Sequence, residues 1–273
     1  MNLLTLLAMA LVAASPQDAC AECQIDLEFL VTLGSEEDMG FVGEVIEVAA
    51  ARDHYYVVLV DDPAHVRVFS ESGAFVRLMG NPGQGPGETR RLSGLQVDSD
   101  GTQHWLDAGL YRYTKIDPEG RISTLPLSMR FWGPPALTVL PDGGLVLNGV
   151  NPLSSAHTLH IIESDGSYRT SFSPLSDTHP ARWQWTTTGP DGNLWSAAYD
   201  VPGIKVWSTS GTLLKELEVP TTTFDARWDQ DWVLTENGPT PAQMDISVSE
   251  DVVWLLQRLP AREWKKAVYE QEN

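Results

Sequence analysis

Glycine-containing polar turns recur along this sequence at a nearly constant spacing, and this repeat constrains the fold more than any other feature. One series of turns has steps of 47, 46 and 45 residues and consists of Gly73, Gly120, Gly166 and Gly211. A second series lies between its members, has steps of 42 and 49 residues, and consists of Gly101, Gly143 and Gly192. Glycine readily adopts the positive φ that tight hairpin turns require. The sequence therefore predicts hairpins built from one repeating unit.

Short apolar segments flank the turns of both series. They cover residues 65–69, 74–79, 95–97, 103–106, 110–116, 136–140, 145–147, 158–162, 193–197, 204–207 and 213–219. Each repeat then holds two hairpins, or four short strands, and no convincing helical period occurs between Val42 and Pro220. Four strands in about 40–50 residues are typical of a β-propeller blade. A solenoid is the alternative, but solenoid repeats are usually shorter or contain helices.

Part of one repeat resembles a known sequence family. His65–Phe69, Gly73–Arg77 and Gly83–Glu88 resemble the NHL repeat, although Thr89 stands where that repeat has a phenylalanine. The whole chain is similar to bacterial six-bladed β-propeller proteins of the NHL/TolB-like group, with a good match over about residues 45–125 and a weak one beyond Pro220. The resemblance implies an all-β, six-bladed propeller of four-stranded blades, and it specifies no activity.

The number of blades is a separate question. Six blades of about 46 residues, starting near residue 45, would extend to roughly residue 320, whereas the sequence has 273 residues. We expect a propeller domain over residues 25–273 with four full blades and the inner half of a fifth, at 244–256. Residues 25–33 are a candidate closing strand. We expect truncation at the C-terminus rather than a ring that is open or completed by a partner, because an open ring leaves two exposed sheet edges.

The N-terminus resembles an export signal. Residues 3–14 form an apolar run, and Ala19-Cys20-Ala21 fits a cleavage site. No lysine or arginine precedes Arg52, so the usual basic segment is missing, and a buried N-terminal helix or strand is the alternative. A bilayer span needs about 20 apolar residues, so this run is too short to cross one. The sequence thus predicts a signal peptide over residues 1–21 and an extracytoplasmic protein, either periplasmic or secreted.

Charge and cysteine content narrow the ligand classes. Lysine and arginine total 18 against 37 aspartates and glutamates, and the net charge of −19 disfavours nucleic acid and anionic membranes. A protein, peptide or glycan ligand is compatible with this charge. The two cysteines, Cys20 and Cys23, are too few for a tetrahedral zinc site. We interpret them as a local disulfide or two incidental thiols.

Four polar residues follow the second strand of successive repeats and are candidate ligand-binding residues. They are Asp61, Asp107, Asn148 and Asp200. Carboxylate and amide oxygens suit calcium, and the sugar-lactonase propellers hold calcium with an acidic and amide set of this kind. The competing interpretation, which we favour, is that each side chain caps backbone amides and fixes its loop.

Tryptophans between the blades are the other candidates. Trp132, Trp183 and Trp185 lie in predicted blade-to-blade connections, where they could line a face for sugars or peptides or simply fill gaps between blades. His157 and His160 should point to opposite faces of one strand, so they are poor partners for a metal. We interpret the glycine-rich segment Gly80–Gly87, which lacks the lysine of a phosphate loop, as a connection between blades.

These observations favour a binding module without a cofactor or a metal. The sequence offers no nucleophile paired with a base, so we do not expect an enzyme. A calcium-dependent lactonase-like hydrolase is the alternative, on account of the Asp and Asn positions. A peptide-processing lyase, an activity found among NHL-like propellers, ranks third because its metal-binding histidines are not recognisable here.

Overall fold

The computed structural model describes nine stretches of the chain. They are residues 28–34, 40–127, 136–149, 156–174, 183–199, 201, 203–219, 242–250 and 252–258. The chain divides into two units, residues 1–30 and residues 31–273, and every strand belongs to the second. The predicted signal peptide, both cysteines, Trp132 and Asp200 lie outside the described residues.

The described residues form 18 strands and no helix, so nothing in this part of the chain could cross a membrane as a helix. Blade 1 contains β1 (Val45–Ala51), β2 (His54–Leu59), β3 (Val66–Ser70) and β4 (Phe75–Met79). Blade 2 contains β5 (Leu92–Val97), β6 (Gln103–Asp107), β7 (Arg112–Ile116) and β8 (Ile122–Pro126). Blade 3 contains β9 (Leu137–Val139), β10 (Leu145–Asn148), β11 (His157–Ile162) and β12 (Tyr168–Pro174). Blade 4 contains β13 (Gln184–Thr188), β14 (Leu194–Ala198), β15 (Ile204–Trp207) and β16 (Leu213–Leu217), and blade 5 is described only by β17 (Ala242–Val248) and β18 (Val253–Arg258).

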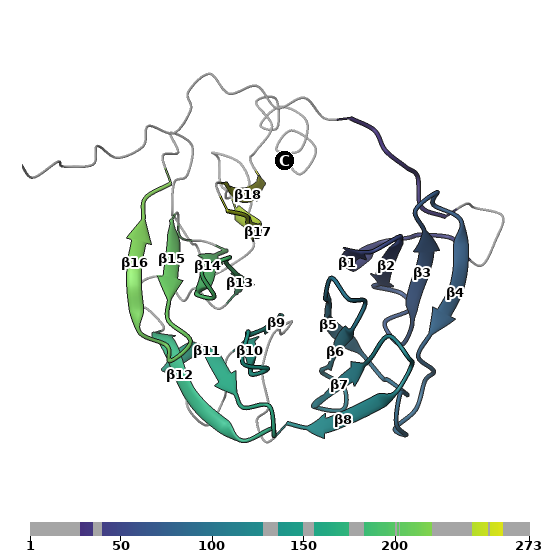
Figure 1. Ribbon diagram of the computed structural model, residues 1–273, viewed down its shortest axis with the longest axis horizontal. Helices are drawn as coiled ribbons and strands as arrows, with labels where there is room; N and C mark the ends of the chain where they lie inside the picture. Colours follow the sequence, from purple (N-terminus) through teal and green to yellow (C-terminus); the bar gives the residue numbers. More distant parts are fainter. Residues whose placement is uncertain are drawn as a thin grey trace, which may run out of the picture. The chain divides into compact units, whose positions relative to one another are not determined.

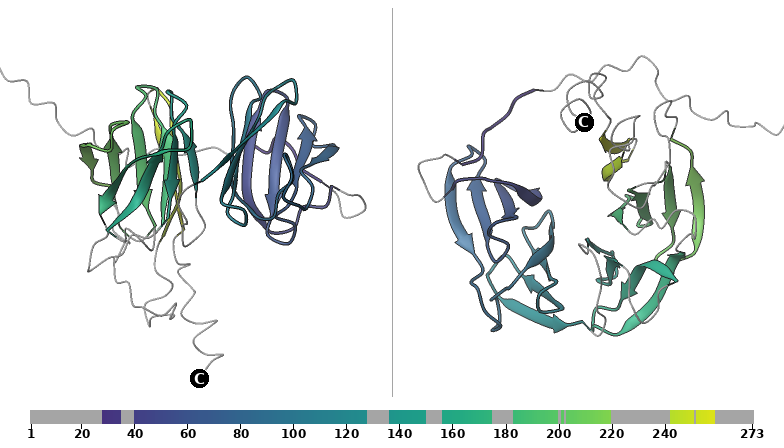
Figure 2. Two further views of the ribbon diagram at one scale, coloured as in Figure 1. Left: turned by 90° about the horizontal axis from the view of Figure 1, so that it is seen from below. Right: turned by 180° about the vertical axis from the view of Figure 1, so that it is seen from behind.

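Each blade is an antiparallel meander in which strands pair in chain order (Figures 1 and 2). The first strands of consecutive blades contact one another: β1 contacts β5, β5 contacts β9, β9 contacts β13, and β13 contacts β17. Stacking of four-stranded meanders through their first strands is the arrangement of a β-propeller. The predicted all-β propeller is therefore confirmed, with four complete blades and the inner half of a fifth among the described residues.

The glycine repeat marks equivalent hairpins, as predicted. Gly73, Gly120, Gly166 and Gly211 connect the third and fourth strands of blades 1 to 4, and their φ angles are 82°, 82°, 87° and 83°. In each hairpin the glycine amide donates to the carbonyl three residues earlier, at 2.9 Å. The second series, Gly101, Gly143 and Gly192, connects the first and second strands with φ angles of 90°, 83° and 76°.

Apolar side chains of consecutive blades meet face to face. Trp105, 1% exposed, fills the interface of blades 1 and 2, and Leu147, fully buried, fills that of blades 2 and 3. Phe172 of blade 3 meets Trp207 of blade 4 edge to face, with ring centroids 5.1 Å apart. Ile246 of blade 5 packs against blade 4. Burial of a large apolar side chain contributes about 1.5–3 kcal/mol, so these interfaces are a main source of stability.

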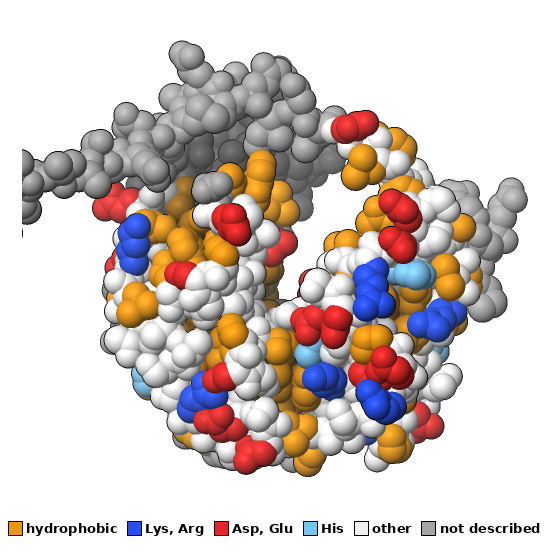
Figure 3. Space-filling model, in the orientation of Figure 1, with side chains coloured by type: hydrophobic (Ala, Val, Ile, Leu, Met, Phe, Trp, Pro, Cys, Tyr) orange, Lys and Arg blue, Asp and Glu red, His pale blue; other side chains and the backbone are white. Residues whose placement is uncertain are grey.

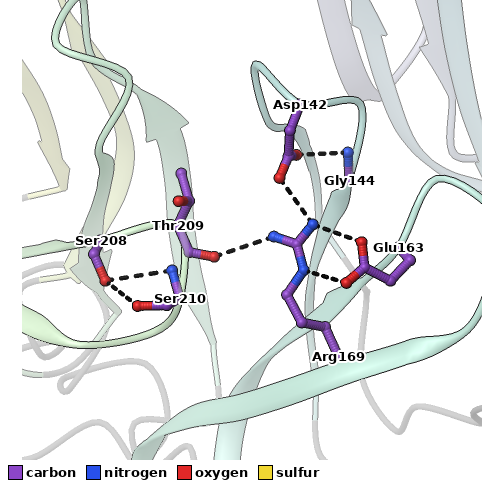
Figure 4. Close-up of polar contacts among 7 residues, drawn as sticks. All are labelled: Asp142, Gly144, Glu163, Arg169, Ser208, Thr209 and Ser210. Carbon is purple, nitrogen blue, oxygen red and sulfur yellow. Dashed lines mark hydrogen bonds and ion pairs between the residues drawn. The ribbon is translucent and has the colours of Figure 1, made fainter.

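A polar contact reinforces the interface of blades 3 and 4 (Figure 4). The Arg169 guanidinium on β12 binds both Glu163 oxygens at 2.6 Å and Asp142 Oδ2 at 2.8 Å. Its third nitrogen donates to the carbonyl of Thr209, 3.2 Å away in the β15–β16 turn of blade 4. One side chain therefore links both hairpins of blade 3 to the next blade.

The expected closing strand at residues 25–33 is not present in the part that is described. Residues 28–34 form no strand, and residues 25–27 lie outside the described part. Residues 31–34 instead contact the β3–β4 hairpin of blade 1, where the Gly34 amide donates to the Gly73 carbonyl at 3.5 Å. Leu33 packs over the face of blade 1 that carries Leu59 and Phe69. Leu33 thus covers apolar surface of blade 1 by side-chain packing, without the hydrogen bonds of a paired strand.

Candidate ligand-binding site

Asp107, one of the four predicted polar residues, fixes loops. It is 1% exposed, and its carboxylate accepts hydrogen bonds from the amides of Arg90 (2.7 Å), Arg91 (3.2 Å) and Leu110 (2.9 Å). These amides belong to the β4–β5 and β6–β7 connections. A carboxylate with three backbone donors has little capacity left for another ligand.

The predicted polar residues do not occupy equivalent positions. In each blade one amide donates to the carbonyl just before the first strand: Val60 in blade 1, Ala108 in blade 2 and Asn148 itself in blade 3. Asp61 is one residue after the donor of blade 1, Asp107 is one residue before the donor of blade 2, and Asn148 is itself the donor of blade 3. Neighbouring strand residues point to opposite faces, so the three described members form no ring. No group of three or more potential metal ligands occurs among the described residues.

Asn148 lies in a buried polar network between blades 3 and 4. It is 2% exposed; its Nδ2 donates to the Gln184 carbonyl at 2.7 Å, and its Oδ1 has no hydrogen-bond partner. Gln184, 4% exposed, donates through Nε2 to Thr158 Oγ1 and to Ser173 Oγ, both at 2.6 Å. An unpaired buried acceptor is unusual, because it costs about 1–3 kcal/mol of desolvation.

His160 extends this network. The side chain is fully buried; its Nε2 lies 2.9 Å from the Gly149 carbonyl and its Nδ1 lies 2.6 Å from Ser171 Oγ. A carbonyl only accepts, so Nε2 carries the proton and Nδ1 accepts from Ser171. Burial lowers the pKa of His160 and keeps the ring neutral. The imidazole thereby holds the residue next to Asn148 in place, and its role here is structural.

Two backbone conformations at this end of the interface are unusual. Ser173 has a φ of 60° and Gly149 has a φ of 152°. A non-glycine residue at positive φ costs about 1–3 kcal/mol and persists where its surroundings hold it. Here the hydroxyl of Ser173 is bound by Gln184, so strain and the polar network coincide.

Three aromatic rings lie at the adjoining end of blade 4. The ring of Tyr199 is 5.6 Å from that of Trp183, nearly perpendicular at 78°, and 5.8 Å from that of Trp185, inclined at 29°. The Tyr199 amide donates to the Trp183 carbonyl at 2.9 Å. Tyr199 is 7% exposed, whereas both tryptophans are half-buried. We call Asn148, Trp183, Trp185 and Tyr199 the rim site.

Gln184 connects the two halves of the rim site. It stands between Trp183 and Trp185 in the chain, and because side chains alternate along a strand, its amide faces blade 3 while the tryptophans face the other side. Trp185 packs in the interface of blades 4 and 5. Of the sequence candidates, Asn148, Trp183 and Trp185 are brought to one rim, although Trp185 lies in β13 and not in a connection between blades as predicted. Gln184 and Tyr199 are additions that the spacing did not indicate.

A second polar cluster has the form of a proton relay. His104, 3% exposed, lies 2.6 Å from the Tyr113 hydroxyl through Nδ1 and 2.9 Å from Asp98 Oδ2 through Nε2. Burial and the Asp98 carboxylate both raise the pKa of Tyr113. The phenol therefore keeps its proton, and this arrangement suits a structural hydrogen bond better than a nucleophile.

Two acidic side chains from different blades influence each other. Burial, assisted by the charge of Asp245, raises the pKa of Glu47 on β1 to about 7. Desolvation also raises the pKa of Asp245 on β17. The surroundings of Glu47 and Asp245 therefore disfavour the ionised form of each carboxyl group.

In the glycine-rich segment Gly80–Gly87, two backbone amides are already hydrogen-bonded to a neighbouring side chain. The Glu88 carboxylate accepts from the amides of Gln84 (2.9 Å) and Gly85 (2.7 Å), which are the groups that could otherwise bind an anion. Arg112 donates to the carbonyls of Gln84 and Glu88. The segment links β4 to β5, as the sequence predicts.

Comparison with known proteins agrees with this geometry. Residues 20–111 match a family model described as a 6-bladed beta-propeller. The chain is a β-propeller protein. The match covers about a third of it, and no curated protein sequence matches the chain.

Solved propeller structures resemble it at low sequence identity. An exported protein from Bacteroides fragilis NCTC 9343 superposes with a TM-score of 0.57 and 16% identity, covering 84% of this chain and 69% of that one. A streptogramin B lyase superposes with a TM-score of 0.52 and 17% identity, covering 77% and 61%. A catalytically inactive virginiamycin B lyase from Staphylococcus aureus with quinupristin gives 0.52 and 16%, covering 77% and 62%. The chain thus spans less than two thirds of the lyases, and the likeness is one of fold.

Proposed function

We propose that this β-propeller is a non-enzymatic binding module of an exported protein and that its ligand binds at the rim site. The observation that carries the proposal is the cluster of Trp183, Tyr199 and Trp185 at one end of blade 4, next to the Gln184 carbonyl that binds Asn148 of blade 3. Aromatic faces with a few fixed polar groups are typical of ligand sites. Trp183 and Trp185 are half-buried.

Export is supported by two independent features. The apolar run at residues 3–14 fits a signal peptide, and one of the similar structures is an exported protein. One similar lyase structure holds quinupristin, which supports the view that a propeller of this kind can carry an organic ligand.

Binding without catalysis is favoured by the state of the polar groups. Tyr113 keeps its proton, His160 is neutral and fully hydrogen-bonded, and the Asp107 carboxylate is occupied by three amides. None of these groups is poised as a nucleophile or a general base.

Titration of the purified chain tests the proposal. Tryptophan fluorescence and calorimetry are recorded with a panel of neutral trisaccharides and tripeptides, and at least one should bind with a stoichiometry of one. Trp183→Ala should weaken that binding at least about tenfold, the value of one good contact. Trp254→Ala is the matched control, because Trp254 is 52% exposed on β18, outside the rim site. Equal losses in both variants, or no binding by any probe, would contradict the proposal.

The calcium-dependent hydrolase is tested in parallel. Thermal melts with and without excess calcium are combined with a lactone hydrolysis assay, and Asp61→Ala is the informative variant. Asp107→Ala is unsuitable, since removal of its carboxylate leaves three amides without acceptors and destabilises the fold with or without calcium. Lactone turnover together with a calcium-dependent rise in Tm that Asp61→Ala abolishes would replace the binding-module proposal.

A further inference from the structure

We infer that Arg90 and Arg91, just before β5 of blade 2, form an arginine pair that binds the carboxylate group of a peptide. Both side chains are exposed, and among the described residues neither guanidinium takes part in a hydrogen bond or an ion pair. The arginine pair contains no residue of the rim site, so this binding site goes beyond the proposed function.

The backbone of both arginines is held by the neighbouring β6–β7 turn. Asp107 Oδ2 accepts from the Arg90 amide at 2.7 Å, and Oδ1 accepts from the Arg91 amide at 3.2 Å. The Arg91 carbonyl accepts from the Ala108 amide at 2.9 Å. Asp107 is 1% exposed, so these bonds are shielded from water. Because the backbone is already ordered, only the two side chains lose conformational entropy when a ligand binds.

Both side chains start beside the same residue of that turn. A Cβ atom built on Gly109 would lie 2.9 Å from the Cβ of Arg90 and 3.3 Å from the Cβ of Arg91. Gly109 is itself exposed, so the two arginines flank a small residue at the surface. From this common start both guanidinium groups can reach one carboxylate, whose two oxygens offer about four acceptor positions.

Arg91 occupies in blade 2 the position that Trp183 occupies in blade 4. Each of these residues immediately precedes the first strand of its blade. Their carbonyls accept from the amides that follow the second strand, those of Ala108 and Tyr199, both at 2.9 Å. Arg91 therefore lies at the same end of the propeller as the rim site, and a ligand that approaches this end encounters the arginine pair.

Nearby carboxylates do not neutralise the arginine pair, because they already bind other groups. Asp107 accepts from three backbone amides, and the Glu88 carboxylate accepts from two amides of the glycine-rich segment. Asp62, in the β2–β3 loop, forms an ion pair with Arg67 at 2.8 Å. The two guanidinium groups therefore keep their capacity to bind an anion.

A single carboxylate suits this site better than a more highly charged anion. Glu44 and Asp61 of blade 1 are exposed at the same end of the propeller, and the whole chain has a net charge of −19. Repulsion from these charges grows with the charge of the ligand, and a phosphate monoester carries about 1.5 to 2 negative charges at pH 7. A peptide with a free C-terminus or one acidic side chain therefore fits the arginine pair.

Calorimetric titration of the full chain with two pairs of peptides tests the site. Acetylated trialanine with a free C-terminus is compared with its C-terminal amide, and a tripeptide amide with a central glutamate is compared with the same peptide carrying glutamine. The acid member of at least one pair should bind about fivefold more tightly, since two charge-assisted contacts at an exposed site give a modest gain. Added salt should reduce this preference.

The double variant Arg90→Gln/Arg91→Gln should lose the preference for the acid peptide. It should fold, because the backbone amides that Asp107 binds remain. Arg77→Gln/Lys215→Gln is the matched control, since it removes two exposed positive charges on β4 and β16 and should keep most of the preference. Arg90→Lys/Arg91→Lys keeps both charges but loses the planar forks, and it should bind the acid peptide more weakly than the unaltered chain.

Three results would overturn the site. They are equal affinity for acid and neutral peptides, a preference that survives in Arg90→Gln/Arg91→Gln, and an equal loss in Arg77→Gln/Lys215→Gln. Tighter binding of inorganic phosphate than of either acid peptide would also overturn the assignment of a carboxylate. Trp183→Ala should leave the preference unchanged, so the rim site and the arginine pair can fail independently. A preference that disappears in Trp183→Ala would place the carboxylate at the rim site instead.

Discussion

Gly120 and Gly211 have nearly the same backbone conformation in different surroundings. Their φ angles are 82° and 83°, but a Cβ atom built on Gly120 meets nothing within 4 Å, whereas one on Gly211 lies 2.9 Å from Cδ1 of Phe172 in the preceding blade. The two turns therefore separate the local role of glycine from its role in blade packing.

We predict that Gly211→Ala destabilises the chain more than Gly120→Ala. Gly120→Ala costs only the strain of a side chain at positive φ, about 1 kcal/mol. Gly211→Ala also displaces Phe172, which packs against Trp207. Urea unfolding of both variants gives the comparison. Equal losses would show that Phe172 yields freely and that this contact does not hold the blades.

Glu47 should make stability depend on pH. Its pKa is about 7 in the fold and near the ordinary value of 4.5 in the unfolded chain. Below pH 4.5 it is protonated in both states. Between 4.5 and 7 the unfolded chain loses the proton first, so the free energy of unfolding falls as pH rises, and above 7 the full loss remains.

Glu47→Gln should remove this contribution. Denaturant titrations at pH 5 and pH 8 should show that the variant gains stability relative to the unaltered chain as pH rises. Glu44→Gln, at an exposed neighbouring position, is the matched control for the loss of one carboxylate near β1. A constant difference between Glu47→Gln and the unaltered chain at both pH values would refute the assignment.

The sequence indicated single residues of the site but not their partnerships. Asn148 follows a recognisable strand and Trp183 precedes one, so both could be selected from their positions. Gln184 gave no signal of its own, because the hydrogen bond that joins residues 148 and 184 exists only after two blades stack. The sequence also did not show that Asp61 and Asp107 occupy different positions in their blades, because these positions depend on where the first two strands of each blade stop pairing.

At the scale of elements, Arg169 and Arg121 form a natural pair. Both lie in or beside the outer hairpin of a blade and bind carboxylates. Arg121 is 78% exposed, and among the described residues its guanidinium pairs with Asp117 and Glu119 of its own turn, whereas Arg169 is 23% exposed and also reaches Thr209 in the next blade.

We predict that Arg169→Ala lowers the free energy of unfolding by roughly 1 kcal/mol, a modest value because its carboxylate partners are solvent-exposed and screened. Arg121→Ala should cause no measurable change. Chemical denaturation at low and high salt tests this, since added salt should reduce the effect of Arg169→Ala. An effect of Arg121→Ala equal to that of Arg169→Ala would indicate that the link to blade 4 contributes nothing.

Strands differed in how well the sequence revealed them. β15 was located to the residue, because its apolar residues lie directly before a glycine turn. β8, β12 and β13 were missed. β8 is largely exposed, and β13 is rich in threonine, so neither shows the apolar alternation on which the prediction depends. Their existence follows from the repeat rather than from their own residues.

At the scale of the whole molecule, two blades keep an exposed apolar face. On β1, Val48 is 57% exposed; on β18, Trp254 is 52% and Leu256 is 62% exposed. Trp254 does not fill an interface between blades as Trp105 does, because the opposite face of β18, with Leu255, is the one that packs on blade 4. Elsewhere in the space-filling view of Figure 3, charged side chains of both signs are interspersed with apolar ones.

We predict that the 273-residue chain self-associates with rising concentration through these faces, since exposed apolar surface and unpaired strand edges favour association. Leu256→Lys should shift sedimentation towards monomer. Leu214→Lys, on β16 at 54% exposure, is the matched control and should have little effect. A chain that sediments as a monomer at every concentration would contradict this prediction.

The central claim is that ligand binds at the rim of blades 3 and 4, and hydrogen–deuterium exchange tests it most directly. Exchange is recorded with and without the trisaccharide that gives the largest fluorescence change. The account predicts slower exchange of amides in residues 145–149, 157–162 and 183–199, where the rim site and its polar network lie. Protection confined to residues 60–65 and 107–112, beside Asp61 and Asp107, or no protection at all, would contradict it.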